Sequence, residues 1–320
     1  MSEARNEPRG IRGVLDELRE RFAAAGIEDP ATDAELLVGH VLGVSRGRVQ
    51  ALAVMGRDLA PDELAALSEL AGERARRVPL QHLTGRAPFR GIELSVGPGV
   101  FVPRPETETV AQFAIDELRR LSDPEPLAVD LCTGSGALAL ALVHEVSEVR
   151  VWAVEKSAEA HAWADRNVRE WGEDRVELLR GDVTELDPIR PEPRDGDPES
   201  PEGIEPGGSE LRRVFAPLAG RVAVLVSNPP YVPRDMVPRD PEVRDHDPEL
   251  ALYSGADGLD LIRVISRIGR DLLRPDGLLV LEHAEMQGSA IRQLLTADGW
   301  REAVTRPDLT GRDRATLARR

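Results

Sequence analysis

Apolar residues in the first quarter of the chain recur at helical spacing. IRGVLDELRERFAAAG repeats apolar residues every three or four positions from Ile11 to Phe22. The next run, DPATDAELLVGHVLG, opens on an Asp–Pro pair typical of a helix start, and a third periodic run begins at Pro61. These runs predict a small all-helical domain over residues 1–84.

The period changes after residue 84. HLTGRAPFRGIELSVGPG alternates apolar and polar residues between glycines, which predicts a hairpin linker over residues 85–100. FVPRPETETVAQFAIDELRRL then predicts a helix, with prolines at its entry and glutamates in its first turn, where the helix dipole favours acids.

Further along, apolar strand-like runs alternate with helical runs. Strands are expected at PLAVDLCT, VRVWAVE, VELLRGD, RVAVLVSN and GLLVLEHA, with helices after most of them. This alternation predicts an α/β domain over residues 101–320, whose parallel sheet is covered by helices on both faces. Ligands of such sheets bind beyond the carboxyl ends of the strands.

Residues 187–209 interrupt this alternation of strands and helices. DPIRPEPRDGDPESPEGIEPGGS holds six prolines and seven acids and offers almost nothing to bury. Such a composition predicts a disordered acidic insertion on the surface.

Composition narrows the functional classes. The 320 residues carry a formal net charge of −16, which argues against a general polyanion binder, and Lys156 is the one lysine. No run of 18 apolar residues and no signal peptide is present, so a cytoplasmic protein without a membrane partner is expected. Cys132 is the one cysteine and the six histidines are scattered, so we expect neither a disulfide nor a metal.

A glycine-containing loop, DLCTGSG at 130–136, joins a predicted strand to a helix. Its glycines allow a tight turn, and the helix start offers free N–H groups to a ligand. Two of the three glycines of the dinucleotide fingerprint are in place, and Asp130 would repel a pyrophosphate. The loop therefore suits a ligand with a positive or neutral hydrogen-bonding group.

Two more acids end predicted strands. Glu155 follows the glycine loop by about 20 residues, where a carboxylate can hold both hydroxyls of a ribose. Asp182 ends the next strand and can accept from an exocyclic amine such as that of adenine. Each acid alone has a simpler explanation as a helix N-cap. Together with Asp130 they fit an adenosyl ligand with a positive charge and no phosphate, which describes S-adenosylmethionine.

SNPPY at 227–231 ends another predicted strand. The Asn228 side-chain oxygen and the Pro229 carbonyl are two acceptors stiffened by the prolines, and they can orient an incoming NH2 group toward a methyl donor. Tyr231 can stack on a planar amide or base. A strand-ending turn with a packed tyrosine is the simpler alternative. The motif leaves open whether the nitrogen belongs to a side-chain amide, adenine, cytosine or guanine.

Several motifs together resemble the release-factor glutamine methyltransferases, the HemK/PrmC family. They are PLQHLTG at 79–85, PGVFVPRPETE at 98–108, DLCTGSGALALAL at 130–142, SNPPYVP at 227–233 and DLTGRDR at 308–314. The resemblance implies a Rossmann-like, seven-stranded class I S-adenosylmethionine-dependent methyltransferase domain, preceded by a helical substrate-recognition domain. It also implies methylation of the glutamine in the GGQ motif of class I peptide release factors.

The resemblance implies two groups of site residues. Beside Asp130 and Asp182, the residues expected to line the cofactor are Cys132, Thr133, Gly134, Ser135, Gly136, Glu155, Val183 and Asn228. The residues expected at the substrate are Asn228, Pro229, Pro230, Tyr231 and Phe101, of which Asn228, Pro229 and Tyr231 are expected to be catalytic.

Three further expectations accompany the resemblance. The segment Pro103–Glu108 would border the pocket. Val183 replaces an aromatic residue of many relatives, which leaves stacking on adenine weaker or supplied elsewhere. EHAEMQG at 282–288 replaces a commoner glycine–tryptophan version, and as a strand-to-helix loop it is expected to have little catalytic consequence.

Three alternatives stay open beside this reading. A nucleic-acid amino-methyltransferase, acting on adenine or guanine with the same edge, should carry a basic groove, whereas this chain is acidic. A ribosomal-protein glutamine methyltransferase would share most of the chemistry. A binding protein without catalysis is disfavoured because Asn228 and the strand-end acids are all present. A monomer that does not bind nucleic acid directly is expected.

Overall fold

The computed structural model describes residues 9–187 and 209–320, and the chain divides into two compact units. The first consists of the residues up to 86 together with 238–246, and the second of 87–237 and 247–320. The predicted disordered insertion falls on residues 188–208, outside the described part of the chain.

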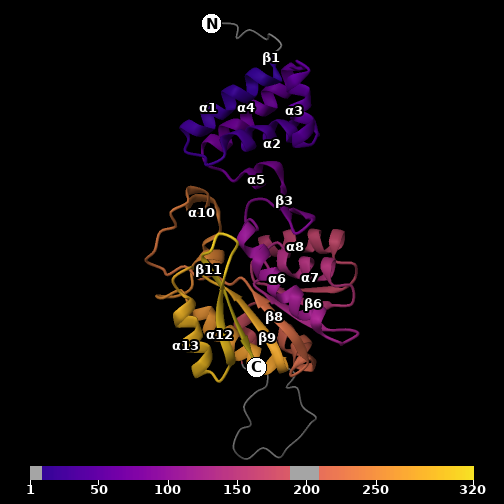
Figure 1. Cartoon of the computed structure of the whole chain (residues 1–320), viewed down its shortest axis with the longest axis vertical. Coiled ribbons are helices and arrows are strands. Elements are labelled where there is room, and N and C mark those ends of the chain that lie inside the picture. Colours follow the sequence, from indigo (N-terminus) through magenta and orange to yellow (C-terminus); the bar gives the residue numbers. More distant parts are fainter. Residues whose placement is uncertain (1–8, 188–208) are drawn as a thin grey trace, which may run out of the picture. The chain divides into compact units, whose positions relative to one another are not determined.

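The first unit is a helical bundle (Figure 1). Its elements are β1 (Arg9–Gly10), α1 (Ile11–Ala24), α2 (Pro30–Leu42), α3 (Arg46–Val54), β2 (Asp58–Leu59), α4 (Pro61–Ala75), α5 (Leu80–Thr84) and α10 (Pro241–His246). The three predicted helical runs correspond to α1, α2 and α4. The Asp29 side chain accepts a hydrogen bond from the Thr32 N–H at 3.2 Å and so caps α2, as the Asp–Pro pair predicts. Apolar side chains on the inner faces of these helices form the core of the bundle.

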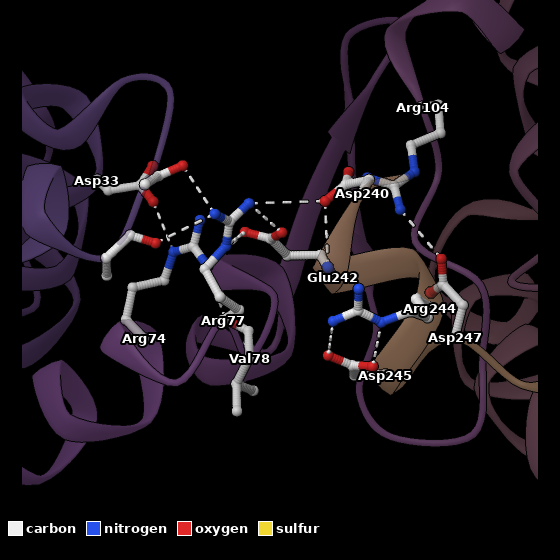
Figure 2. A network of polar contacts seen from close by, with 12 residues as sticks. Asp33, Arg74, Arg77, Val78, Arg104, Asp240, Glu242, Arg244, Asp245 and Asp247 are labelled. Carbon is white, nitrogen blue, oxygen red and sulfur yellow. Dashed lines mark hydrogen bonds and ion pairs between the residues drawn. The ribbon is translucent and has the colours of Figure 1, made fainter. Parts of the chain in front are cut away.

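A buried ion-pair network joins α10 to the bundle (Figure 2). Arg74 of α4 is 6% exposed, and it donates to Asp33 Oδ2 at 2.6 Å and to Glu242 Oε1 at 2.9 Å. Arg77 donates to both carboxylate oxygens of Glu242. Burial by itself would raise the pKa of Glu242, but hydrogen bonds with Arg77, Asp240 and Arg74 lower it to about 2.

This network explains a difference from the sequence analysis, which assigned residues 238–246 to the methyltransferase domain. The structure groups them with the helical bundle. Without Glu242, the guanidinium groups of Arg74 and Arg77 would lack the carboxylate that both of them contact. A buried charge without such a partner is costly.

The second unit is built on a larger sheet with helices on both faces. The strands of the larger sheet are β5 (Leu127–Leu131), β6 (Arg150–Glu155), β7 (Val176–Arg180), β8 (Val222–Ser227), β9 (Leu273–Glu282), β10 (Arg301–Pro307) and β11 (Asp313–Arg319). A separate two-stranded sheet precedes it in the chain and consists of β3 (Arg86–Phe89) and β4 (Ile92–Ser95). The helices of the second unit are α6 (Pro105–Arg120), α7 (Ala137–Glu145), α8 (Ala158–Trp171), η1 (Val183–Leu186), α9 (Glu210–Phe215), η2 (Ala216–Leu218), α11 (Glu249–Leu252), α12 (Asp260–Leu272) and α13 (Gly288–Ala297).

Seven strands of the described residues form this sheet in the order β10-β11-β9-β8-β5-β6-β7. The strands from β5 to β9 pair in parallel, and β11 runs antiparallel to both of its neighbours. The predicted α/β class with a seven-stranded sheet and a preceding helical domain is confirmed. None of the helices among residues 9–187 and 209–320 has the length and apolarity needed to cross a membrane.

Both faces of the sheet are covered by apolar layers. Alternate residues of each strand belong to different layers: Ala128 and Val224 pack with α6, α7 and α8, whereas Val129 and Leu225 pack with α9, α12 and α13. Figure 1 shows α6, α7 and α8 on one side of the sheet, with α12 and α13 on the other. Burial on both faces explains why the strands are almost continuously apolar in sequence.

The order of the strands in the sheet reverses at β5. From β5 the chain continues outward through β6 and β7, and then returns to the other side of β5 as β8. The Ser227 hydroxyl donates to the Leu131 carbonyl at 2.5 Å and ties the ends of these two strands together. Such a switch point leaves a crevice beyond the carboxyl ends of the strands, where ligands of α/β sheets bind.

Candidate active site

The strand register brings the predicted site residues to one edge of the sheet. Leu131 of β5 pairs with Val154 of β6 and with Ser227 of β8, and Ser227 pairs in turn with Leu281 of β9. The residues that follow these four positions therefore lie at one level of adjacent parallel strands. They are Cys132, Glu155, Asn228 and Glu282.

Asp130 holds the glycine loop through two hydrogen bonds. Its Oδ2 accepts from the Thr133 hydroxyl at 2.5 Å and from the Ala139 N–H at 3.1 Å. Its Oδ1 is buried and has no hydrogen-bond partner among the described residues. Burial raises the pKa of Asp130 to about 7 against these hydrogen bonds, and nearby Glu155 raises it as well. One carboxylate oxygen thus holds the loop, and the other is an acceptor without a partner in the described part of the chain.

Glu155 joins the end of β6 to the same loop. Its Oε2 accepts from the Gly134 N–H at 2.9 Å, and its Oε1 accepts from the Ser157 N–H at 2.7 Å. Burial raises the pKa of this carboxyl, and the two backbone donors oppose the increase. Gly134 has φ +60°, and a Cβ built on it would meet no atom within 4 Å. The loop therefore presents its backbone to open space.

The rest of the glycine loop is held by a buried asparagine. Asn167 of α8 is fully buried, and its amide nitrogen donates to the carbonyls of Ser135 and Ser95 at 2.9 and 3.0 Å. Cys132 has a left-handed φ of +64°, and burial raises the pKa of its thiol, which keeps it neutral. Gly136 has φ +88° and begins α7. The sequence analysis did not identify Asn167, but it could have done so, because Asn167 is a polar residue on the apolar face of a helix.

Asp182 caps a short helix. Its Oδ1 accepts from the Thr184 N–H at 2.9 Å, and its Oδ2 pairs with Lys156 Nζ at 2.7 Å. Burial would raise the pKa of Asp182, but the hydrogen bonds from Lys156 and Thr184 lower it overall. The N-cap explanation therefore applies to this acid, and its contact with an adenine stays a prediction. Val183 is buried in the layer beneath α12, and its place beside the cofactor also stays a prediction.

Asn228 follows the last residue of β8, and a hydrogen bond orients its side-chain amide. Its Nδ2 donates to the Thr107 hydroxyl of α6 at 3.5 Å, which turns the amide nitrogen toward α6 and the oxygen the other way. Thr107 belongs to the segment that the family resemblance expects at the border of the pocket. Pro229, the next residue, is buried.

The backbone of Tyr231 is held from two sides. Gln287 donates from Nε2 to the Tyr231 carbonyl at 2.9 Å and to the Asp257 carbonyl at 3.2 Å. Gly258 lies so close that a Cβ on it would be 2.1 Å from the same Tyr231 oxygen. Burial raises the pKa of the Tyr231 phenol, which is therefore neutral and no proton acceptor. These contacts hold the end of the SNPPY segment rigid.

Phe101 lies under a guanidinium group. The Arg104 guanidinium is 5.2 Å from the Phe101 ring centroid, and it pairs with Asp247 at 3.0 Å (Figure 2). The ring thus makes a cation–π contact with Arg104. Its contact with substrate stays a prediction, as does that of Pro230.

Comparisons with known proteins bear on the identity of this site. A family model described as the PrmC N-terminal domain matches residues 14–85. A release factor glutamine methyltransferase of Streptomyces coelicolor is 45% identical, over 94% of this chain and 95% of that protein. A protein of the same name from Bifidobacterium longum is 40% identical, over 96% of this chain and 99% of that protein. The chain belongs to the release factor glutamine methyltransferase family.

A solved structure bears a related description. It is a release factor-specific protein-(glutamine-N5) methyltransferase from Alicyclobacillus acidocaldarius, 24% identical, with a TM-score of 0.37 over 71% of this chain and 98% of that chain. Membership of the release factor glutamine methyltransferase family depends on the sequence relatives, whose identity extends over nearly the whole chain.

The family motifs do not account for two polar residues at this site. Glu282 ends β9 beside Asn228, is 1% exposed, and has no hydrogen-bond partner for its Oε2 among the described residues. Gln287 holds Tyr231. Both belong to EHAEMQG, which is a strand-to-helix loop as predicted. The small catalytic consequence expected of this loop stays a prediction, although Gln287 of the loop contacts the Tyr231 carbonyl. The rule that identified Glu155, an acid at the end of a strand, also applies to Glu282.

The described residues contain no cluster of three or more His, Cys, Asp or Glu side chains arranged as a metal site.

Proposed function

We propose that the protein transfers a methyl group from S-adenosylmethionine to the side-chain amide nitrogen of the glutamine in the GGQ motif of class I peptide release factors. The orientation of Asn228 carries this proposal. Its amide nitrogen is bonded to Thr107, so its oxygen is available as an acceptor at the switch point of the sheet. The relatives that align with nearly the whole of this chain are named release factor glutamine methyltransferases.

The glycine loop fits the proposed methyl donor. S-adenosylmethionine supplies an electrophilic methyl group on a sulfonium, and it also carries an ammonium group. Asp130 Oδ1, which has no partner within residues 9–187 and 209–320, is a suitable acceptor for such a cation. Glu155 retains acceptor capacity for ribose hydroxyls beyond its two backbone bonds. The open space over Gly134 gives a ligand access to the backbone.

Orientation of the acceptor amide is the main task of the chain's own residues. The Asn228 oxygen and the Pro229 carbonyl each accept one hydrogen of the substrate NH2, which directs its nitrogen along the line of transfer. The same two acceptors stabilise positive charge as it develops on that nitrogen. The nitrogen forms its bond to the methyl carbon as the methyl–sulfur bond breaks, which would leave S-adenosylhomocysteine as a neutral thioether. The methylated nitrogen then loses one proton to water, so no strong base is needed beforehand. Tyr231 stacks on the planar amide.

In this proposal, the helical unit recognises the substrate protein. We assign recognition of the release factor to residues 1–84, and we expect the enzyme to act as a cytoplasmic monomer. Removal of this segment should then raise KM for the release factor far more than the Kd for S-adenosylmethionine.

Methyl transfer to purified release factor tests the proposal directly. The protein is incubated with methyl-labelled S-adenosylmethionine and a class I release factor, either intact or with its GGQ glutamine replaced. Label should enter the intact factor alone. Label that persists after the replacement would refute the substrate assignment. Parallel incubations with DNA, RNA and ribosomal proteins test the alternatives, and label in any of these instead of the release factor would favour that class.

A further inference from the structure

Glu282 is a buried carboxyl group that the chemistry above does not use. It is the last residue of β9, and the pairing of Ser227 with Leu281 sets it beside Asn228 at the same level of the sheet. The side chain is 1% exposed, and its Oε2 has no partner among the described residues. A buried acid in the middle of a ligand-binding edge needs a physical reason, because burial disfavours its charge.

The groups around Glu282 come from three neighbouring segments. Thr107 and Asn228 act on the pKa of its carboxyl through hydrogen bonds, and Arg314 of β11 and Glu106 of α6 act on it through their charges. The charge of Glu282 in turn raises the pKa of Tyr231. Burial raises the pKa of Glu282 to about 7; Thr107, Arg314 and Asn228 lower it, and Glu106 raises it. The carboxyl therefore changes its charge near neutral pH.

We propose that Glu282, together with Thr107, is a positioning residue that keeps the Asn228 oxygen turned toward the substrate amide. The inference rests on the proposed function, in which that oxygen accepts a substrate hydrogen. An ionised carboxylate can only accept hydrogen bonds, so it selects the NH2 end of the Asn228 amide. The Thr107 hydroxyl accepts from Asn228 Nδ2 at 3.5 Å and has its own hydrogen left to donate to Glu282. A flipped Asn228 would point two donors at the substrate NH2 and repel it.

The proposal makes the orientation depend on pH. Protonated Glu282 gains a donor that can bond to the Asn228 oxygen and compete with the substrate for it. The productive orientation is therefore favoured above pH 7 and is progressively lost as the pH falls through that value. Turnover at saturating substrates should follow the same curve.

The three asparagines of the chain, Asn6, Asn167 and Asn228, allow a test that needs no release factor. Labelling asparagine with ¹⁵N gives three side-chain amide signals, and Asn228→Asp identifies its own by removing it. We expect the Asn228 signal to titrate with a midpoint near pH 7 in the wild type and to be independent of pH in Glu282→Gln. Asn167, bound to backbone carbonyls, is the internal reference. An Asn228 signal that does not titrate, or that titrates equally in Glu282→Gln, overturns the proposal.

Measurement of kcat with the release factor as substrate is the second test of the proposal. Glu282→Gln should lower kcat by about 10- to 100-fold, leave the Kd for S-adenosylmethionine within about twofold, and abolish the fall in kcat below pH 7. Thr107→Val should lower kcat in the same way, and Thr107→Ser should retain it. Glu117→Gln is the matched control, since it removes a buried charge of the same unit that pairs with Arg319 at 2.8 Å. Its kcat should stay within about twofold.

The outcomes separate the two proposals. Wild-type kcat and pH profile in Glu282→Gln overturn the positioning role. If Glu282→Gln does not fold, equal kcat in Thr107→Val and Thr107→Ser overturns it instead. If the wild type does not methylate the release factor but the Asn228 signal titrates as expected, the orientation by Glu282 stands and the proposed substrate is wrong.

Discussion

Replacement of Glu242 by Gln removes one charge from the buried network of the helical unit. Glu242 is 8% exposed and pairs with both Arg74 and Arg77. The substitution keeps the size of the side chain and one acceptor oxygen, but it leaves the two arginines without the carboxylate they share. Loss of one partner from a buried ion pair is expensive because the remaining charge stays buried.

The pKa of Glu242 sets the size of the effect. The difference between an ordinary value of 4.5 and the value of about 2 in the folded protein corresponds to roughly 3 kcal/mol. This agrees with the lower end of the range of about 3–5 kcal/mol for removing one partner of a buried pair. Since the folded-state pKa is the lower one, this stabilisation is complete above about pH 4.5 and is lost as the pH falls toward 2. Glu242→Gln should lack this part of the acid dependence.

Hydrogen exchange measured by mass spectrometry can localise the loss. At pH 7, peptides from α1, α2 and α4 should exchange about 100-fold faster in Glu242→Gln, as the free-energy difference requires. The four tryptophans, Trp152, Trp163, Trp171 and Trp300, all lie in the methyltransferase unit. Unfolding followed by tryptophan fluorescence should therefore change little.

Asp245→Asn is the matched control on the same short helix. Asp245 pairs with the neighbouring Arg244 at 2.7 Å, but both side chains are almost half exposed. Exposed pairs of this kind contribute little, so exchange in the helical unit should stay within about threefold of the wild type. Equal exchange in Glu242→Gln and Asp245→Asn would contradict the stabilising role of the network.

Three further substitutions test the active site. Asn228→Ala should lower kcat by about 100-fold or more while the Kd for S-adenosylmethionine, measured by calorimetry, stays within about threefold; near-wild-type turnover would disprove the acceptor role. Asp130→Asn should weaken S-adenosylmethionine binding by about tenfold, because it replaces an unsatisfied acceptor by a weaker one, and an unchanged Kd would contradict this. Gly258→Ala should lower kcat by about tenfold or more, since its Cβ would press on the Tyr231 carbonyl, whereas Gly311→Ala, also at positive φ but in open space, should leave kcat unchanged.

The sequence alone predicted the features that depend on strand order and apolar pattern. Helical spacing identified α1, α2 and α4, and the alternation of strands and helices identified the α/β class. Polar residues at the carboxyl ends of parallel strands must meet at one edge of a sheet, and this placed Glu155 and Asn228 on the same level. These predictions succeeded because the register is set by apolar residues within each strand.

Contacts between distant segments could not be predicted in the same way. The pairing of Glu242 with Arg74 and Arg77 joins positions more than 160 residues apart, and nothing in the local pattern of α10 indicates which unit it belongs to. A short helix with few apolar residues is compatible with either unit. In the structure its place is marked by the pairing of Glu242 with Arg74 and Arg77, because buried charges need partners.

The orientation of Asn228 shows where such prediction ends. Its position at the end of β8 follows from the apolar run before it, but an amide has two ends with opposite hydrogen-bonding character. In our proposal, the end that faces the substrate depends on Thr107, from a helix that precedes β8 by more than 100 residues, and on Glu282, from the strand that follows. The position of a polar residue at a strand end therefore indicates the proposed acceptor, whereas the side chains that we propose to orient it are found only when the structure brings three separate segments together.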